Sequence, residues 1–212
     1  MSTLWGASLH VGLLAVAPAG ALPVLSEAFY DATGSDNGLV FVEIHGEAGT
    51  NLDGLSVEGI NGSDGGVTVS LALSGAIPAD GFFVLADDAG GGMSSVPEAD
   101  LVLDFDFQNG PDSILLREGD SVLDALGYGV FEAGQVFAGE GTPAPDAPAG
   151  SSLARHFADL DSDDNAADFA VQGVPTPGIA PLSGIPEPSS ALLVAVGLLG
   201  LAQRGSRGAL RI

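Results

Sequence analysis

Short apolar runs alternate with clusters of Gly, Asp, Asn and Pro from Leu22 to about Pro181. Their spacing of about 8 to 15 residues is typical of many short β-strands separated by turns. In the run 39–45, Val40, Val42 and Ile44 share one face of the expected strand, because side chains alternate with a period of two. The runs that predict strands are Val24–Tyr30, Leu39–His45, Gly54–Ile60, Val67–Leu73, Phe82–Ala86, Asp100–Phe105, Ser113–Arg117 and Val122–Gly127.

Glycine is abundant in this region and favours turns over helices. The chain contains 32 glycines, and stretches such as NGSDGG and DDAGGG are suited to tight turns. We therefore expect no helix between Leu22 and Pro181. Many short strands joined by glycine-rich turns predict an all-β domain, with a β-sandwich as the first choice and a β-barrel as the second.

The N-terminal segment has the layout of a secretory signal peptide. Leu9–Ala17 is a short apolar stretch, and Ala19 and Ala21 are the small residues that a cleavage site needs. The segment before the apolar stretch contains no Lys or Arg, so either the signal is atypical or the true start lies elsewhere. A buried first strand or helix of the domain is the alternative. We predict that residues 1–21 are a signal peptide and that the protein is exported.

The C-terminal end carries an apolar run followed by arginines. Ala191–Ala202 is entirely apolar or Gly, and its uncharged flanks extend it to about 15 residues, against the ~20 of a free-standing membrane span. Length alone therefore leaves a buried core helix as an equal candidate. Arg204, Arg207 and Arg211 follow the run directly, as is typical of a cytoplasmic end, and two prolines prevent the helix from extending upstream. We predict one short transmembrane helix that ends in the cytoplasm.

The whole C-terminal segment, 182–212, resembles a known sorting signal. "IPEPSSALLVAVGLLGLAQRGSR" is similar to the PEP-CTERM signal, with its motif at Pro186, Glu187 and Pro188, a short transmembrane helix and a basic tail. The tail here is less dense in arginine than is usual. In that family the signal is recognised by an exosortase, a membrane-embedded enzyme of Gram-negative bacteria that make extracellular polysaccharide. The resemblance implies an exosortase partner, a transient inner-membrane anchor, and release or attachment at the cell surface or extracellular matrix. A permanent anchor is the alternative.

The central region, 22–181, resembles a lamin tail domain. The similar stretches are "LSEAFYDATGSDNGLVFVEIHGEAGTNLDGLSVEGING", "IPADGFFVLADD", "NGPDSILLREGDSVLDALGYG" and "GSSLARHFADLDSDDNAADFAVQGVPTPGIA". The last of these matches the family's closing motif, with a Ser-Leu-x-Arg strand. This chain differs at Val57, where the family has Trp, and at Gly46, where it has Asn. The resemblance implies an immunoglobulin-like β-sandwich.

Charge and composition limit the classes of partner that this domain can bind. The chain has 28 acidic residues against five arginines, a formal charge of −23, and every acid lies between Glu27 and Glu187. Nucleic acid and anionic lipid are excluded as partners of this region, because their phosphates would be repelled. A hydrophobic content of 46% supplies enough apolar surface for a folded core. The absence of cysteine excludes disulfides, thiolate metal sites and a cysteine nucleophile.

The stretch "DLDSDDNAAD", residues 159–168, is the sharpest polar cluster. Such an oxygen-rich loop suits Ca²⁺, which takes six to eight oxygen ligands. An EF-hand is excluded, because Asp164 stands where its loop needs Gly and Ala170 where it needs Glu. The alternative is a structural turn whose side chains bond their own backbone amides, with Asp168 and Asn165 orienting the last strand. The candidate Ca²⁺ ligands are Asp159, Asp161, Asp163, Asn165 and Asp168.

Catalytic signals are weak. Beyond the signal peptide only His45 and His156 remain, and no Gly-x-Ser-x-Gly or His-Glu-x-x-His pattern accompanies them. Glu43 and His45 share a strand face, which we interpret as a surface polar pair. Arg117 and Arg155 are expected to form ion pairs with nearby acids.

We therefore expect no catalytic residues, no enzymatic activity and no cofactor other than the candidate Ca²⁺. The predicted role is structural or adhesive, with extracellular polysaccharide or surface proteins as partners. A Ca²⁺-dependent binding module and a secreted hydrolase are the alternatives.

Overall fold

The structure is a computed structural model that describes residues 21–180. The predicted sorting motif, the transmembrane helix with its arginine flank, and all of the predicted signal peptide except Ala21 lie outside these residues. Within 21–180, no helix has the length and apolar character needed to cross a membrane. The elements are β1 Val24–Phe29, β2 Phe41–His45, β3 Leu55–Asn61, β4 Val67–Ala72, β5 Phe82–Asp87, β6 Leu101–Leu103, β7 Asp112–Glu118, β8 Ser121–Tyr128, β9 Ser152–Arg155, α1 Asn165–Asp168 and β10 Phe169–Gln172.

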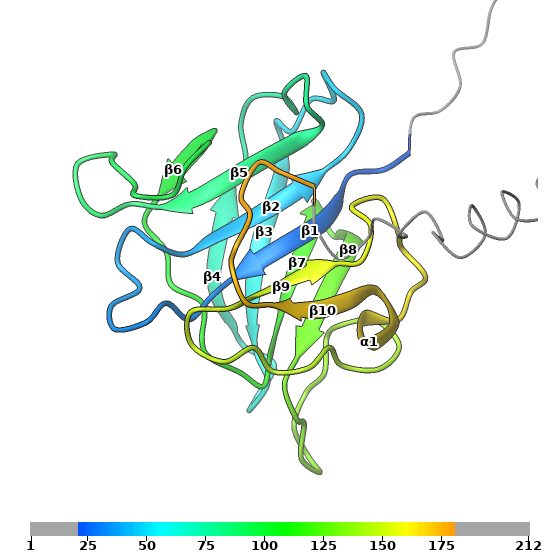
Figure 1. Ribbon diagram of the computed structural model, residues 1–212. Helices are drawn as coiled ribbons and strands as arrows, with labels where there is room; N and C mark the ends of the chain where they lie inside the picture. The colour runs from blue at the N-terminus through cyan, green and yellow to red at the C-terminus, as the bar shows by residue number, and fades with distance from the viewer. Residues whose placement is uncertain (1–20, 181–212) are drawn as a thin grey trace, which may run out of the picture.

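The strands form two sheets, so the expected all-β class is confirmed (Figure 1). One sheet has six strands in the order β10-β9-β1-β2-β5-β6, and the other has four in the order β4-β3-β7-β8. Pairing is antiparallel except between β5 and β6, which run parallel. Each apolar run that predicted a strand contains one, although the run 100–105 yields only the three residues of β6.

The expectation of no helix is wrong at one position, because α1 forms a single helical turn. Asp164 lies just before it in extended conformation and caps it by accepting a hydrogen bond from the backbone N–H of Ala166 (3.2 Å). The same carboxylate accepts a hydrogen bond from the backbone N–H of Thr142 (3.1 Å). This short-range capping supplies a partner for an N–H that the first turn of a helix leaves free.

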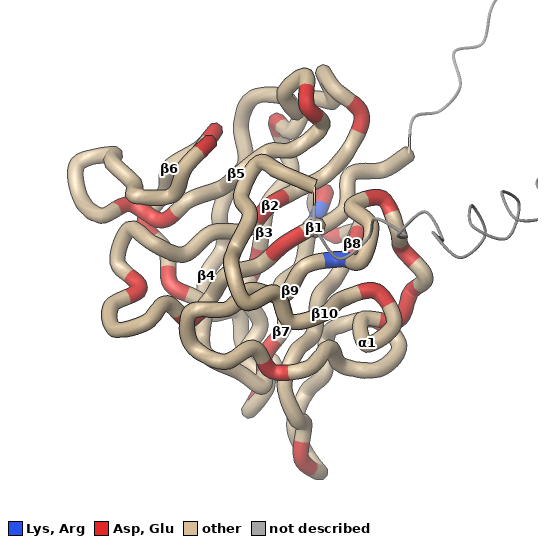
Figure 2. The backbone as a smooth tube through the Cα atoms, in the orientation of Figure 1, with Lys and Arg blue, Asp and Glu red and all other residues tan. Residues whose placement is uncertain are grey.

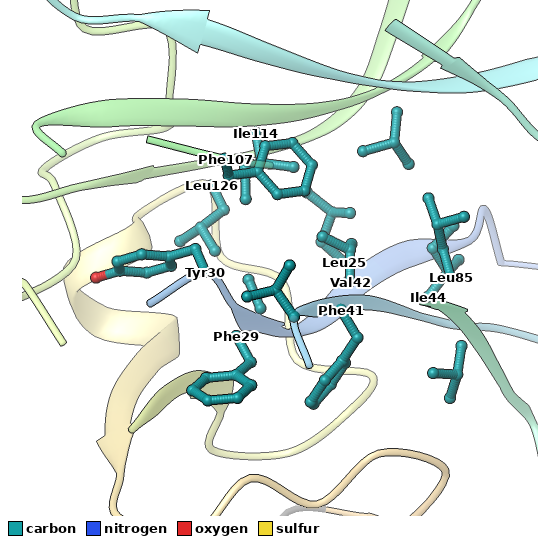
Figure 3. Packing of buried hydrophobic residues seen from close by; sticks show 14 of the residues in the cluster. Leu25, Phe29, Tyr30, Phe41, Val42, Ile44, Leu85, Phe107, Ile114 and Leu126 are labelled. Atoms are coloured by element: carbon teal, nitrogen blue, oxygen red, sulfur yellow. The ribbon is translucent and has the colours of Figure 1, made fainter. Parts of the chain in front are cut away.

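The core lies between the two sheets (Figure 3). Leu25, Val42 and Ile44 from the six-stranded sheet belong to one buried cluster with Ile114 and Leu126 from the four-stranded sheet. Each is at most 1% exposed, and burying such a side chain contributes roughly 1.5–3 kcal/mol. The period-two pattern of the sequence therefore points the expected residues into the core.

The second face of β2 is also buried, which the sequence pattern did not predict. Phe41 and Glu43 lie on the face opposite Val42, yet both are at most 1% exposed. Residues 173–180, which we call the C-terminal strap, cross this outer face of the six-stranded sheet (Figure 1). The interpretation of Glu43 and His45 as a surface polar pair is therefore wrong for Glu43, because the strap covers it.

Candidate functional site

Arg155, at the end of β9, is the centre of a buried polar network. Its side chain is fully buried and stacks on Phe169, with the guanidinium carbon 4.5 Å from the ring centroid. Nη2 donates to Asp124 (2.8 Å) and Nη1 to Asp168 (3.0 Å), while Nε donates to the carbonyl of Leu25 (2.7 Å). Arg155 thus ties β8, α1 and the start of β1 together. The expected ion pair is confirmed.

The other expected ion pair is weaker. Arg117 lies 3.6 Å from Glu58 across the β3–β7 pair, and both side chains are about one fifth exposed. An exposed pair of this kind contributes about 0–1 kcal/mol.

Three carboxyl groups meet beside Arg155. Asp124 is on β8, Glu140 follows β8 and Asp161 follows β9, and each offers an oxygen within 4.8 Å of the others. Oε2 of Glu140 is buried and has no hydrogen-bond partner among the described residues. Burial, followed by the negative charges of Asp124 and Asp161, raises the pKa of Glu140 to about 8. This cluster can therefore hold a proton at neutral pH, or a cation that replaces the proton.

Two of the predicted Ca²⁺ ligands, Asp168 and Asn165, form hydrogen bonds with other groups of the protein. Asp168 accepts hydrogen bonds from Arg155 and from the backbone N–H (2.8 Å) and hydroxyl (2.6 Å) of Ser162. Asn165 accepts from the N–H groups of Gly127 (2.8 Å) and Glu140 (2.9 Å), and it donates to the carbonyl of Ala125 (2.7 Å). The bond from the Ser162 N–H to Asp168 is of the kind that the alternative interpretation of the loop predicted, whereas the partners of Asn165 lie far from the loop along the chain.

The other three predicted ligands, Asp159, Asp161 and Asp163, are exposed in the loop between β9 and α1. Only Asp161 belongs to the cluster with Asp124 and Glu140. Sequence reasoning missed these two partners, because they lie far from the loop along the chain. A signal was present for Asp124, since it is an acid within the apolar run Val122–Gly127.

A cavity of about 410 Å³ opens next to Asp161, at the start of β1. The ring of His45 forms part of its wall and lies 4.8 Å from that of Phe82, and His45 Nδ1 is buried without a partner among the described residues. His156 does not line this cavity. The other lining residues are Ala21, Leu22, Val24, Gly46, Glu47, Leu123, Asp159 and Asp161.

A second hollow of about 560 Å³ lies beside β5 and contains four aspartates. Asp87 is buried there and accepts hydrogen bonds from the N–H groups of Gly38 (2.6 Å) and Phe105 (2.9 Å). Asp36, Asp104 and Asp106 complete the acidic wall. Acidic residues are in fact spread over most loops of the fold (Figure 2), so this hollow shares a property of the whole surface.

Two buried glutamates hold the C-terminal strap. Glu27 on β1 lies opposite Glu43 on β2, and both side chains are inaccessible to solvent. Glu27 accepts hydrogen bonds from the backbone (2.9 Å) and hydroxyl (2.8 Å) of Thr176, and Glu43 accepts from the N–H of Gly178 (2.7 Å) and the hydroxyl of Ser26 (2.6 Å). Burial raises the pKa of both groups, that of Glu43 to about 8.

Comparison of the sequence with models of known protein families finds no match, and comparison with curated proteins finds no relative.

Proposed function

We propose that this chain is an exported surface protein whose β-sandwich, residues 22–181, has a non-catalytic structural or adhesive role outside the cell. The main support for the proposal is that the buried charged side chains bind other parts of the domain. Arg155, Asp124 and Asp168 brace the interior, and Glu27 and Glu43 hold the strap. The most buried ionisable groups are thus engaged in holding the fold together, as a durable extracellular module requires.

The position of the folded unit supports export. β1 begins at Val24, three residues after the proposed cleavage site, and the strap is held at Gly178, shortly before the proposed sorting segment. A signal peptide and a C-terminal anchor would therefore flank the domain without interrupting a strand. The site for an exosortase would be Pro186-Glu187-Pro188, which lies outside the described residues.

The finer fold assignment is also part of the proposal. A six-stranded and a four-stranded sheet around one core support an immunoglobulin-like sandwich of the lamin-tail kind. The two positions that differ from that family, Val57 and Gly46, are compatible with their surroundings in this structure. Val57 is fully buried in the core, and a Cβ at Gly46 would lie 2.7 Å from Ile77. Fold alone does not identify the ligand, and we propose extracellular polysaccharide or another surface protein.

Processing gives the first test. In cells that contain an exosortase, the mature protein will lack Ala191–Ile212, which intact mass measurement of the released protein will show. A variant with Pro186→Ala, Glu187→Ala and Pro188→Ala will keep its C-terminus and remain in the membrane fraction. Released wild-type protein that still ends at Ile212 would contradict the proposed sorting.

The alternative, a Ca²⁺-dependent module, is favoured by one observation. Glu140 Oε2 is buried without a partner beside Asp124 and Asp161, where a divalent cation would relieve the repulsion among the carboxylates. If its Kd lies in the 0.1–1 mM range of extracellular calcium modules, then about 10 mM Ca²⁺ will raise the free energy of unfolding by about 1.4–2.7 kcal/mol.

Calorimetry of the mature protein with CaCl₂ at pH 7 tests this alternative. Because the pKa of Glu140 is raised to about 8, binding will release a proton, and the heat will depend on the ionisation enthalpy of the buffer. Glu140→Gln will abolish the signal. Asp163→Asn is the matched control and will leave it unchanged, since Asp163 lies outside the cluster. No heat and no rise in melting temperature would exclude the calcium module.

A further inference from the structure

The cavity at the start of β1 is strongly acidic. Its wall contains Glu47, Asp159 and Asp161, and no Arg or Lys of the described residues lines it. Arg155 lies 3.6 Å from Asp161 but is already shared with Asp124 and Asp168. The cavity therefore combines excess negative charge with an apolar lining.

Leu22 reaches this cavity because the first strand is held close by. The N–H of Leu25 donates to Asp124 (2.5 Å), and the carbonyl of Leu25 accepts from Arg155 (2.7 Å). Three residues span at most about 10 Å, so the backbone nitrogen of Leu22 stays near this anchored point. Leu22 itself lines the cavity together with Asp159 and Asp161.

Cationic groups are scarce in this protein, so a new one beside the acidic cavity would have few competitors for its carboxylates. The sequence contains no lysine, and both arginines of the described region, Arg117 and Arg155, are in ion pairs. Hydrolysis of the peptide bond between Ala21 and Leu22 by a signal peptidase leaves a carboxylate on Ala21 and an ammonium group on Leu22. In the mature protein that ammonium group would be the only amine.

We propose that removal of the signal peptide completes this site: the α-ammonium group of Leu22 binds the carboxylates of Asp159 and Asp161 and fastens the mature N-terminus to the loop after β9. The inference rests on the proposed export and on cleavage after Ala21. Before cleavage the same nitrogen is a neutral amide and cannot form the ion pair. Maturation therefore stabilises the domain at its N-terminal edge.

The absence of lysine makes the test selective. The mature protein released by cells is treated with an amine-acetylating reagent in EDTA at pH 7, and only its α-amine can react to give an amide. Acetylation will lower the melting temperature by about 2–4 °C. The acetylation rate will be about five- to tenfold lower than in the variant Asp159→Asn/Asp161→Asn, whose amine is free and whose melting temperature will not respond to acetylation.

The matched control removes two acids that follow the ends of β3 and β8, at the end of the four-stranded sheet away from Leu123 and the cavity. Asp64→Asn/Glu132→Gln changes the net charge equally and will behave like the wild type in both measurements. N-terminal sequencing separates the two levels of the inference. A first residue other than Leu22 would overturn the proposed cleavage site and the ion pair with it. With Leu22 first, equal acetylation rates in the three proteins would overturn the ion pair alone.

Discussion

Replacing Arg155 by methionine will lower the free energy of unfolding by about 3–5 kcal/mol. The substitution leaves the carboxylate of Asp124 buried without its ion-pair partner, and it removes the hydrogen bonds to Asp168 and to the carbonyl of Leu25. Since a whole domain is stable by only about 5–15 kcal/mol, the loss is a large share of the total. Urea denaturation followed by far-ultraviolet circular dichroism measures it.

The chain offers a matched control in its other described arginine. Arg117→Met removes an ion pair that is partly exposed at 3.6 Å, and it will cost only about 0–1 kcal/mol. Arg155→Met combined with Asp124→Leu will recover part of the lost stability, because no uncompensated charge then remains at Asp124. Equal losses for the two single variants would show that the buried network does not brace the sandwich.

The stability of the domain will fall as the pH rises from about 5 to about 8.5. Burial raises the pKa of Glu43 from 4.5 to about 8, so the folded protein keeps a proton that the unfolded chain releases. The resulting stabilisation is complete below pH 4.5 and is lost as the pH rises through 8. At about 1.4 kcal/mol for each pH unit, Glu43 alone accounts for on the order of 5 kcal/mol. Glu27, whose pKa burial also raises, acts in the same direction.

Denaturation curves at several pH values test this dependence. Glu43→Gln keeps a neutral side chain against Gly178 and Ser26 and will make the pH profile less steep between pH 5 and 8.5, while Glu27 and Glu140, whose pKa values are also raised, keep the remaining slope. Glu118→Gln, at an exposed position, will keep the wild-type slope. A stability that rises with pH over this interval, or an unchanged slope in Glu43→Gln, would contradict the role assigned to the buried carboxyl group.

The predictions for Arg155 and for Glu43 concern one structural feature: buried acids bind segments that are far apart in sequence. Asp124 and Arg155 secure the start of β1, and Glu27 and Glu43 secure the strap. The ion pair proposed for the ammonium group of Leu22 would add an acid-held contact at the N-terminus of the mature chain. A domain whose two ends are fastened in this way would resist fraying where proteases act first.

Local signals in the sequence predicted most of the strands. The period-two pattern of Val40, Val42 and Ile44 depends only on neighbouring residues, and the structure places all three in the core. The Ser-Leu-x-Arg resemblance likewise fell on β9. The turn α1 was missed although its cap, Asp164, is a local signal, because a helix of four residues is too short to show a helical period of apolar residues.

By itself, the sequence determined the all-β class, most of the strand positions and the acidity of the domain, because alternation and turn residues act over a few positions and charge is additive. Only the tertiary structure decided which acids are buried. Five carboxylates in "DLDSDDNAAD" look alike along the chain, yet Asp168 is enclosed by Arg155 and Ser162, while Asp161 is exposed and meets the buried Asp124 together with Glu140. The energy of a charge depends on its surroundings in space, and those surroundings come from strands far apart in the sequence.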